Sequence, residues 1–353
     1  MKIKLAILEK DQGYLNRLVS VFSTKYSDKF QMYSFTELDY AMGALDSEKI
    51  DVFISNDFFN IEVDKLPKRC SFAYFVDNVD IDTVNGQRAI CKFQKAELIY
   101  KQILSIYSEN AGSLAGFKLT DDECKIIAFS SPCGGCGTSS VAASCALYFA
   151  KRNKRVLFLS FEDFGSPNLY FSGEGQFDMS DVIFALKSKK SNVAMKLESY
   201  VKKDVSGVYF FSAAKFSLDM LELNHEERLQ LITQLKMFGA YDYIILDCDF
   251  GLDKKHLDYY KKAHHIIMVG DGSKISNLKI SNACSSLVTI DQSLDVSLAN
   301  RFSLIYNKFS NKTGSTLSDV DIRNLGGAPI FLQATEHQIL EQLSKMDLFE
   351  KLA

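Results

Sequence analysis

Residues 125–140 read KIIAFSSPCGGCGTSS, and this stretch decides the fold. It begins with the apolar run KIIAFSS (125–131), which is typical of a strand buried on both faces, and it leads into the alanine-rich helical pattern SSVAASCALYFAKR (139–152). The glycine-rich turn between them can hold phosphate groups, because glycine N–H groups curl around an anion and the helix N-terminus adds partial positive charge. A plain tight turn with Ser139 as the N-cap is the alternative.

Further apolar runs follow this helix and predict the strands of a parallel sheet. They are VLFLSF (156–161), GVYFFS (207–212), YIILDC (243–248), HIIMVG (265–270) and FSLIYN (302–307). Parallel strands need long crossover connections, which are usually helices. We therefore expect an α/β domain at 121–353.

The first 110 residues show the same alternation of strand-like and helix-like segments. The strand-like runs are KIKLAIL (2–8), FQMYSF (30–35), DVFIS (51–55), FAYFV (72–76) and RAICK (88–92). This rhythm predicts a five-stranded, doubly wound domain at 1–110. The polar run SENAGSLAG (108–116), which is rich in small residues, places a linker at 111–120. The predicted fold class is therefore α/β, with two doubly wound parallel-sheet domains.

Composition limits the classes of function. The 353 residues include 41 Lys and Arg against 44 Asp and Glu, so no basic excess favours general DNA binding. No apolar run approaches the roughly 20 residues that span a bilayer, and the short apolar core at 5–8 is unlike a secretory signal. The eight cysteines lack a framework of short regular spacings, which indicates reduced thiols. We expect a cytoplasmic protein without an integral membrane segment.

The glycine-rich turn resembles the deviant Walker A motif of the MinD/ParA ATPases, Lys-Gly-Gly-x-Gly-Lys-[Ser/Thr]-[Ser/Thr]. On this register Cys133 replaces the signature lysine, and Thr138 replaces the lysine that grips the phosphates. The resemblance implies a P-loop NTPase domain with ATP and Mg²⁺ as cofactors. The loop positions that it implies for nucleotide binding are Cys133, Gly134, Gly135, Cys136, Gly137, Thr138, Ser139 and Ser140. Loss of both lysines weakens transition-state stabilisation more than ground-state binding, so we expect at most a weak ATPase.

Two carboxylates stand where the same family places its acidic site residues. Asp247 ends the strand YIILDC, resembles the Walker B aspartate, and would hold Mg²⁺ through water together with the Ser139 hydroxyl. Glu162 follows the run at 156–161, where the family has its switch I acids, and would be the catalytic residue that orients water. The structural alternatives are a loop-capping carboxylate for Asp247 and a surface acid for Glu162.

The base-binding residues that the resemblance implies lie near the C-terminus. Asn307 ends the strand FSLIYN, where the family uses asparagine to read the adenine edge. The segment GGAPIFLQ (326–333), which includes Pro329, would pack against the base.

Cys133 and Cys136 also form a C-x-x-C pair, which is compatible with thiol redox chemistry or with half of a zinc site. No second pair stands at ligand spacing, since Cys124 and Cys145 are each nine residues from a member of the pair. Tolerated loop positions are the favoured interpretation, and redox or metal chemistry is the alternative.

The N-terminal domain resembles the receiver of a response regulator. Glu9 and Asp11 match the acid pair after the first strand, and Lys92 matches the lysine after the fifth. Asn56 stands at the phosphoacceptor position, and a carboxamide cannot be phosphorylated as a carboxylate is. We therefore interpret this half as a pseudo-receiver with a docking role. The alternative is a register in which Asp57, one residue later, is the acceptor.

A pseudo-receiver joined to a MinD/ParA-like domain without its signature lysine resembles the TadZ/CpaE-like localisation proteins of Tad (Flp) pilus assembly. The resemblance extends from residue 1 to about 350. It implies an ATP-dependent homodimer that marks a bacterial cell pole and recruits the pilus assembly and secretion machinery. A ParA-type DNA-binding or regulatory ATPase is the main alternative, although basic clusters such as KSKK (187–190) are short. A two-component output protein is a third alternative, which Asn56 disfavours.

Overall fold

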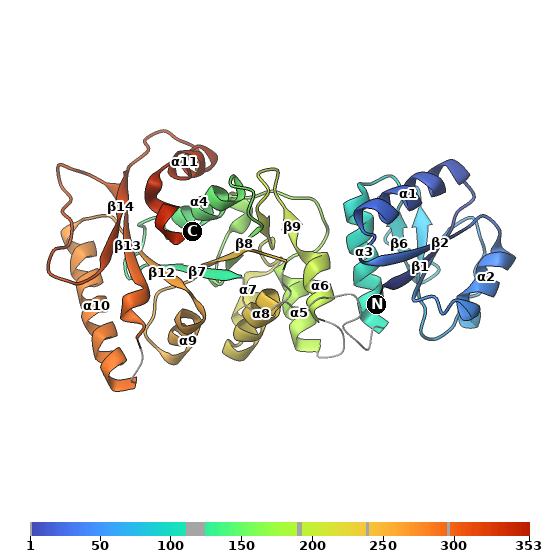
Figure 1. Ribbon diagram of the computed structural model, residues 1–353, viewed down its shortest axis with the longest axis horizontal. Coiled ribbons are helices and arrows are strands. Elements are labelled where there is room, and N and C mark those ends of the chain that lie inside the picture. Colours follow the sequence, from blue (N-terminus) through green and yellow to red (C-terminus); the bar gives the residue numbers. More distant parts are fainter. Residues whose placement is uncertain (1, 111–123, 189–192, 238–239, 295–296) are drawn as a thin grey trace. The chain divides into compact units, whose positions relative to one another are not determined.

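The computed structural model describes residues 2–110, 124–188, 193–237, 240–294 and 297–353 (Figure 1). The chain divides into two compact units, each with its own sheet. The linker predicted at 111–120 lies outside the described residues. Among the helices that are described, none is both long enough and apolar enough to cross a membrane.

The N-terminal unit contains a six-stranded sheet with the order β2-β1-β3-β4-β6-β5. Its strands are β1 (Ile3–Leu8), β2 (Phe30–Phe35), β3 (Val52–Asn56), β4 (Ser71–Val76), β5 (Thr83–Val84) and β6 (Gln87–Cys91). Its helices are α1 (Gln12–Lys25), α2 (Leu38–Ser47), the 3-10 turn η1 (Val63–Lys65) and α3 (Ala96–Asn110). Neighbouring strands are parallel except for β5 and β6. The five parallel strands have the order of a doubly wound, flavodoxin-type domain, which confirms the predicted fold class.

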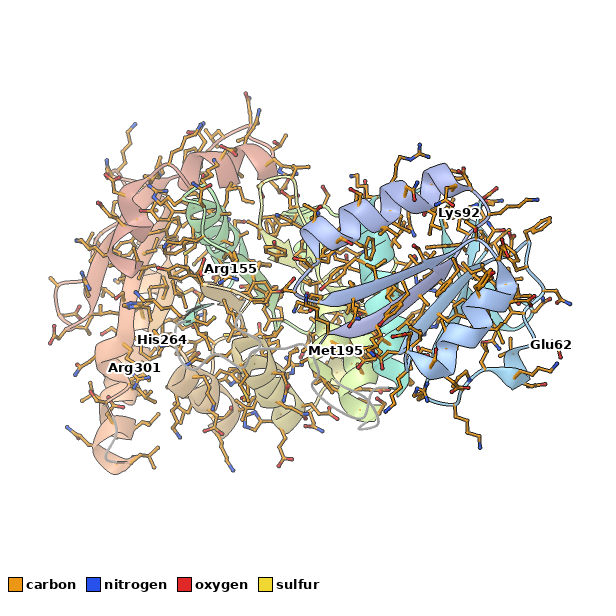
Figure 2. All side chains as sticks on the ribbon, turned by 45° about the vertical axis from the view of Figure 1, so that its right-hand side comes forward. Glu62, Lys92, Arg155, Met195, His264 and Arg301 are labelled. Atoms are coloured by element: carbon orange, nitrogen blue, oxygen red, sulfur yellow. The ribbon has the colours of Figure 1, made fainter. Side chains whose placement is uncertain are left out.

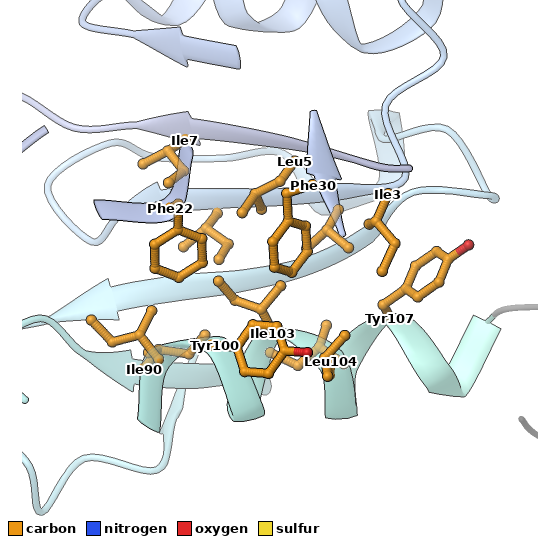
Figure 3. Packing of buried hydrophobic residues seen from close by; sticks show 14 of the residues in the cluster. Ile3, Leu5, Ile7, Phe22, Phe30, Ile90, Tyr100, Ile103, Leu104 and Tyr107 are labelled. Atoms are coloured by element: carbon orange, nitrogen blue, oxygen red, sulfur yellow. The ribbon is translucent and has the colours of Figure 1, made fainter. Parts of the chain in front are cut away.

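Side chains of β1 alternate between the two faces of this sheet. Ile3, Leu5 and Ile7 enter a cluster with α1 and α3, whereas Ala6 and Leu8 enter a second cluster with α2. Figure 3 shows the first cluster, in which side chains of the sheet meet those of α3. This period of two explains why apolar residues occupy successive positions of the strand, because both of its faces are covered.

A helix from later in the sequence completes the N-terminal unit. The unit includes residues 184–188 and 193–200, and α6 (Val193–Tyr200) packs along α3. Met195, labelled in Figure 2, is fully buried in the cluster of α1 and α3. The Tyr100 hydroxyl donates a hydrogen bond of 2.5 Å to Glu198 Oε1, and Lys29 Nζ lies 3.8 Å from Glu198 Oε2. Burial raises the pKa of the Glu198 carboxyl, and these two partners offset part of that cost.

The C-terminal unit contains an eight-stranded sheet with the order β14-β13-β12-β7-β11-β8-β10-β9. Its strands are β7 (Lys125–Ser130), β8 (Val156–Ser160), β9 (Lys202–Lys203), β10 (Tyr209–Phe210), β11 (Tyr243–Asp247), β12 (His265–Gly270), β13 (Phe302–Phe309) and β14 (Arg323–Pro329). Neighbouring strands are parallel except for β9 and β10. The edge strand β14 was not predicted, because its sequence RNLGGAP contains glycine and proline, which are poor strand formers.

Helices cover both faces of this second sheet, with α4 and α11 on one face and α8, α9 and α10 on the other (Figure 1). The helices of this half are α4 (Thr138–Ala150), the first five residues (179–183) of α5 (Met179–Ser188), α7 (Ser217–Glu222), α8 (His225–Met237), α9 (Lys254–Lys262), α10 (Lys274–Leu294) and α11 (Glu336–Leu343). Short 3-10 turns are η2 (Pro167–Leu169), η3 (Ala299–Arg301) and η4 (Asp347–Leu352). Residues 141–149 of α4 are all buried, since α4 lies between the sheet and α11. The loop before α4 is therefore held at the carboxyl end of a central strand, where ligands bind in such sheets.

Replacement of Met195 by alanine tests whether α6 is part of the N-terminal unit. We expect Met195→Ala to lower the free energy of unfolding of this unit by about 2–4 kcal/mol, because a fully buried side chain is lost from its core. Urea denaturation, with amide hydrogen exchange of α3 as the local readout, measures the effect. Met237→Ala is the matched control, because Met237 is 41% exposed, and it should change stability by less than about 0.5 kcal/mol. Equal effects of the two substitutions would contradict the packing of α6 on α3.

Candidate nucleotide-binding site

The loop between β7 and α4 forms the floor of the candidate site. Gly135 and Gly137 have φ angles of 77° and 79°, which residues with a side chain adopt only at a cost. The Ser131 hydroxyl holds the start of the loop, because it donates to Val269 O at 2.6 Å and accepts from Cys133 N at 3.0 Å. The glycine-rich turn is thus fixed directly before the N-terminus of α4, which is a position where helices bind anions.

The end of β13 is fastened to this loop. Asn307 is buried and its Nδ2 donates to Cys136 O at 2.8 Å, while Lys308 Nζ donates to Gly135 O at 2.8 Å. A Cβ atom on Gly137 would lie 2.6 Å from Asn307 Nδ2, which is closer than such atoms approach. The contact between loop and strand therefore requires glycine at this position. The adenine-reading role of Asn307 stays a prediction, and its side-chain nitrogen here holds the loop.

Carboxylates gather beside the start of α4. Ser139 Oγ donates to Glu162 Oε2 at 3.3 Å. Asp247, at the end of β11, is 1% exposed, and its Oδ1 has no hydrogen-bond partner among the described residues. Two effects raise the pKa of the Asp247 carboxyl: burial is the larger, and the negative charge of Glu162 is the smaller. The pKa of the Glu162 carboxyl is also raised, mainly by burial and to a smaller extent by the negative charge of Asp249. The site therefore concentrates carboxylates that disfavour one another's ionisation.

A divalent cation fits this arrangement. Hydroxyl and carboxylate oxygens are ligands that Mg²⁺ prefers, and a cation would supply the missing partner of Asp247 Oδ1. Within the part of the chain that is described, no group of three or more His, Cys, Asp and Glu side chains could hold a metal ion by itself. The other ligands of Mg²⁺ would then be water and phosphate oxygens, which is the usual mode of this ion at phosphate sites.

A cavity of about 280 Å³ joins the loop to these carboxylates. Of the residues predicted from sequence, its wall includes Cys133, Gly134, Gly135, Gly137, Thr138, Ser139 and Glu162. Those outside the wall are Cys136, Ser140, Asp247, Asn307 and Pro329. Ser140 Oγ instead lies 3.4 Å from the Tyr170 hydroxyl, and Pro329 is exposed at the end of β14. The loop thus meets Glu162 and Asp249 in one cavity, whereas Asp247 and Pro329 lie outside its wall.

Arg228 of α8 holds the segment that carries Glu162, although no sequence motif pointed to it. Arg228 is 3% exposed and donates to Phe161 O at 2.5 Å and to Asp163 Oδ1 at 2.8 Å, on either side of Glu162. It also donates to two backbone carbonyls at the end of α7. Because a buried guanidinium needs these partners, its bonds fix the backbone on both sides of Glu162. Lys308 was also missed, although its position directly after Asn307 was a usable signal.

The receiver-type acid cluster of the N-terminal unit is paired internally. Lys92 Nζ lies 3.3 Å from Glu9 Oε2 and 2.7 Å from Asp77 Oδ1. Asn56 Nδ2 donates to Glu9 Oε2 at 3.0 Å, so the side chain at the acceptor position is an uncharged amide bonded to Glu9 of the acid pair. Asp57 is exposed, and its phosphorylation stays an untested alternative.

Comparisons with known proteins agree with this architecture. Residues 1–108 match the family model described as TadZ-like, receiver domain. The crystal structure of a ParA family ATPase from Chlorobium tepidum is similar to this chain, with a TM-score of 0.52 and 20% identity, over 65% of this chain and 96% of that one. The MinC:MinD complex of Aquifex aeolicus (TM-score 0.48, 17% identity, 65% of this chain and 95% of that one) is another similar structure. No curated protein matches the chain.

The chain therefore combines a receiver-type α/β domain with a second domain of the ParA-type fold. The assignment of the ParA-type fold to the second domain rests on the structure from Chlorobium tepidum, whose TM-score exceeds 0.5. Residues 1–108 match a TadZ-like receiver domain, and the domain that follows has the ParA-type fold, which is the order of domains that the motifs indicated.

Replacement of Asp247 by asparagine separates stability from ligand binding. In the absence of divalent cations, we expect Asp247→Asn to raise the free energy of unfolding by about 1 kcal/mol or more, because a buried carboxylate without a full set of partners is removed. The extra stability that Mg²⁺ and ATP give to the wild type should be lost. Thermal and urea denaturation with and without these ligands measure both effects.

Asp253→Asn is the matched control for this substitution. Asp253 caps α9 on the protein surface, and asparagine caps a helix nearly as well, so stability and ligand response should stay within about 0.5 kcal/mol of wild type. An Asp247→Asn variant that keeps the full response to Mg²⁺ and ATP would exclude Asp247 from the metal site.

Proposed function

We propose that this protein is an ATP-binding localisation scaffold of the Tad (Flp) pilus assembly system. It acts in the bacterial cytoplasm at a cell pole, forms a homodimer around ATP and Mg²⁺, and recruits pilus assembly and secretion proteins. The observation that carries this proposal is the glycine loop, held against Asn307, that opens onto Ser139 and Glu162. The TadZ-like receiver domain supports the pilus system in particular.

The loop itself has no lysine, so phosphate binding in this proposal uses backbone groups of the loop and one lysine from outside it. Cys133 and Thr138 are uncharged, so binding relies on glycine N–H groups, on the N-terminus of α4 and on the cation of Lys308 beside Gly135. Bound Mg²⁺ would neutralise part of the phosphate charge. These groups stabilise the bound nucleotide. The loop has no lysine, however, to stabilise the negative charge that develops on the γ-phosphate in the transition state of hydrolysis.

Slow hydrolysis suits a scaffold. A ligand that binds only the dimer stabilises it by mass action for as long as the ligand stays intact. A loop that binds ATP without rapid turnover would therefore keep the dimer assembled while partner proteins collect. Glu162, held by Arg228 through its neighbours, would orient water for whatever hydrolysis occurs.

Substitution of Gly137 tests the loop directly. We expect Gly137→Ala to weaken ATP binding by about tenfold or more, which corresponds to at least about 1.4 kcal/mol, because the new Cβ displaces Asn307 and deforms the loop. Calorimetric titration with ATP and with ADP, read together with molecular mass by light scattering, measures binding and dimerisation. The wild type should bind ATP in the presence of Mg²⁺ and double its mass.

Gly207→Ala is the matched control, because Gly207 also has a positive φ, 91°, but open space lies where its Cβ would be. It carries a similar backbone cost outside the loop and should bind ATP as the wild type does. If neither nucleotide binds the wild type, or if both alanine variants bind equally, the loop is not a nucleotide site.

Restoration of a lysine tests the account of slow turnover. We expect Thr138→Lys to strengthen ATP binding by about tenfold, since a charged hydrogen bond to phosphate contributes about 1.5–3 kcal/mol, and to raise the hydrolysis rate. Thr138→Met has a similar length without the charge and should do neither. If the lysine and methionine variants behave alike in both assays, the missing charge does not limit the site.

A further inference from the structure

The proposed function does not use the two thiols of the loop. Cys133 and Cys136 stand three positions apart in the turn before α4 and flank Gly134 and Gly135. Both are free cysteines and both are buried, with exposed fractions of 7% for Cys133 and 2% for Cys136. Cys133 lines the cavity of the candidate site, and Cys136 is not part of its wall. Of the two residues, Cys133 is therefore the one beside the cavity, and Cys136 is the more deeply buried.

The surroundings of the two thiols favour reaction at Cys133. Its Sγ lies 3.5 Å from Ser276 O, and its amide nitrogen donates to Ser131 Oγ at 3.0 Å, so its position is fixed. A hydrogen bond with the Cys136 side chain, and more weakly the charge of Lys279, lowers the pKa of the Cys133 thiol to about 6. The same hydrogen bond and burial raise the pKa of Cys136. A thiol of lowered pKa at a cavity wall, next to a more deeply buried thiol, is the arrangement in which the first attacks and the second resolves.

We propose that Cys133 and Cys136 form a reversible disulfide within the nucleotide loop, with a low-molecular-weight disulfide such as glutathione disulfide as the oxidant. The Cys133 thiolate attacks one sulfur of the oxidant and releases one thiolate. Cys136, after loss of its proton, attacks the Cys133 sulfur of the mixed disulfide and releases the second thiolate. The released thiolates take up the two protons, so the protein loses two hydrogen atoms and one oxidant becomes two thiols.

This disulfide would weaken nucleotide binding, and this part of the inference rests on the proposed function. A disulfide holds its sulfurs about 2 Å apart and restricts the Cα atoms of the pair. The ring that it closes contains Gly134 and Gly135, whose N–H groups would face phosphate, and it includes Cys136, whose carbonyl oxygen accepts from Asn307. Closure of the ring turns these peptide groups, so the oxidised loop binds ATP more weakly. By linkage, ATP then favours the dithiol form to the same extent.

The 353-residue protein is equilibrated in glutathione buffers of graded redox ratio. It is then quenched with acid, alkylated and analysed by peptide mass spectrometry. In the wild type we expect an unalkylated, disulfide-linked Cys133–Cys136 peptide that is 2 Da lighter than the dithiol form and that disappears on reduction. Cys133→Ser and Cys136→Ser should abolish it, and Cys284→Ser, a partly exposed cysteine outside the loop, should leave it intact. Thermal unfolding confirms that each variant folds. Persistence of both thiols under the most oxidising buffer, or pairing with other cysteines instead, would overturn the proposal.

A second arm measures ATP affinity for the reduced and oxidised wild type and for oxidant-treated Cys133→Ser, which lacks the attacking thiol. We expect oxidation to weaken ATP binding at least fivefold in the wild type, with full recovery on reduction, and to leave Cys133→Ser at its own untreated affinity. If the disulfide forms but neither form binds ATP, the redox pair stands and the proposed function fails. If ATP binds but no disulfide forms, the proposed function stands and this inference fails. Equal affinities of the two forms would refute the coupling.

Discussion

The close approach of Asn307 to Gly137 is the constraint on which the candidate site depends. There is no room for a Cβ atom at residue 137, and the Asn307 amide bonds to the carbonyl of Cys136 in the same turn. The end of β13 and the start of α4 are therefore fixed against each other, although 170 sequence positions separate residues 137 and 307. Ser139 lies two residues after this junction, and its hydroxyl donates to Glu162, which follows β8, while Asp247 ends the neighbouring strand β11.

The carboxylates of the site explain why the absence of lysine from the loop affects ligand binding. Burial and mutual repulsion raise the pKa values of Asp247 and Glu162, and Asp247 Oδ1 has no partner among the described residues. Such a cluster costs stability in the absence of a ligand, which is typical of functional sites rather than of structural ones. Lysines in the loop would offset the negative charge of these carboxylates. In this chain a bound metal ion would offset it instead, so binding of ATP and binding of Mg²⁺ should be strongly coupled.

The sequence predicted most of the fold because its signals are local. The run 265–270 is apolar enough to identify a buried strand at its observed bounds, the run 30–35 has the bounds of the partly exposed edge strand β2, and the glycine loop defines the junction with α4. The sequence could not reveal contacts between distant segments. Arg228 lies in an ordinary charged helix, and only the fold brings it to Phe161 and Asp163. Met195 of α6 likewise enters the core of the N-terminal unit through packing that no local pattern encodes. The edge strand β14 was not predicted, because its glycines are unfavourable in strands.

The most direct test of this account is equilibrium binding of ATP to the wild-type protein at pH 7 in the presence of Mg²⁺ and in the presence of a chelator. ATP binding should strengthen by about tenfold or more with Mg²⁺, since the metal offsets the charge of both the phosphates and the carboxylates. Binding of equal strength with and without Mg²⁺, or no binding at millimolar ATP, would contradict the central claim that this loop and its carboxylates form a nucleotide site.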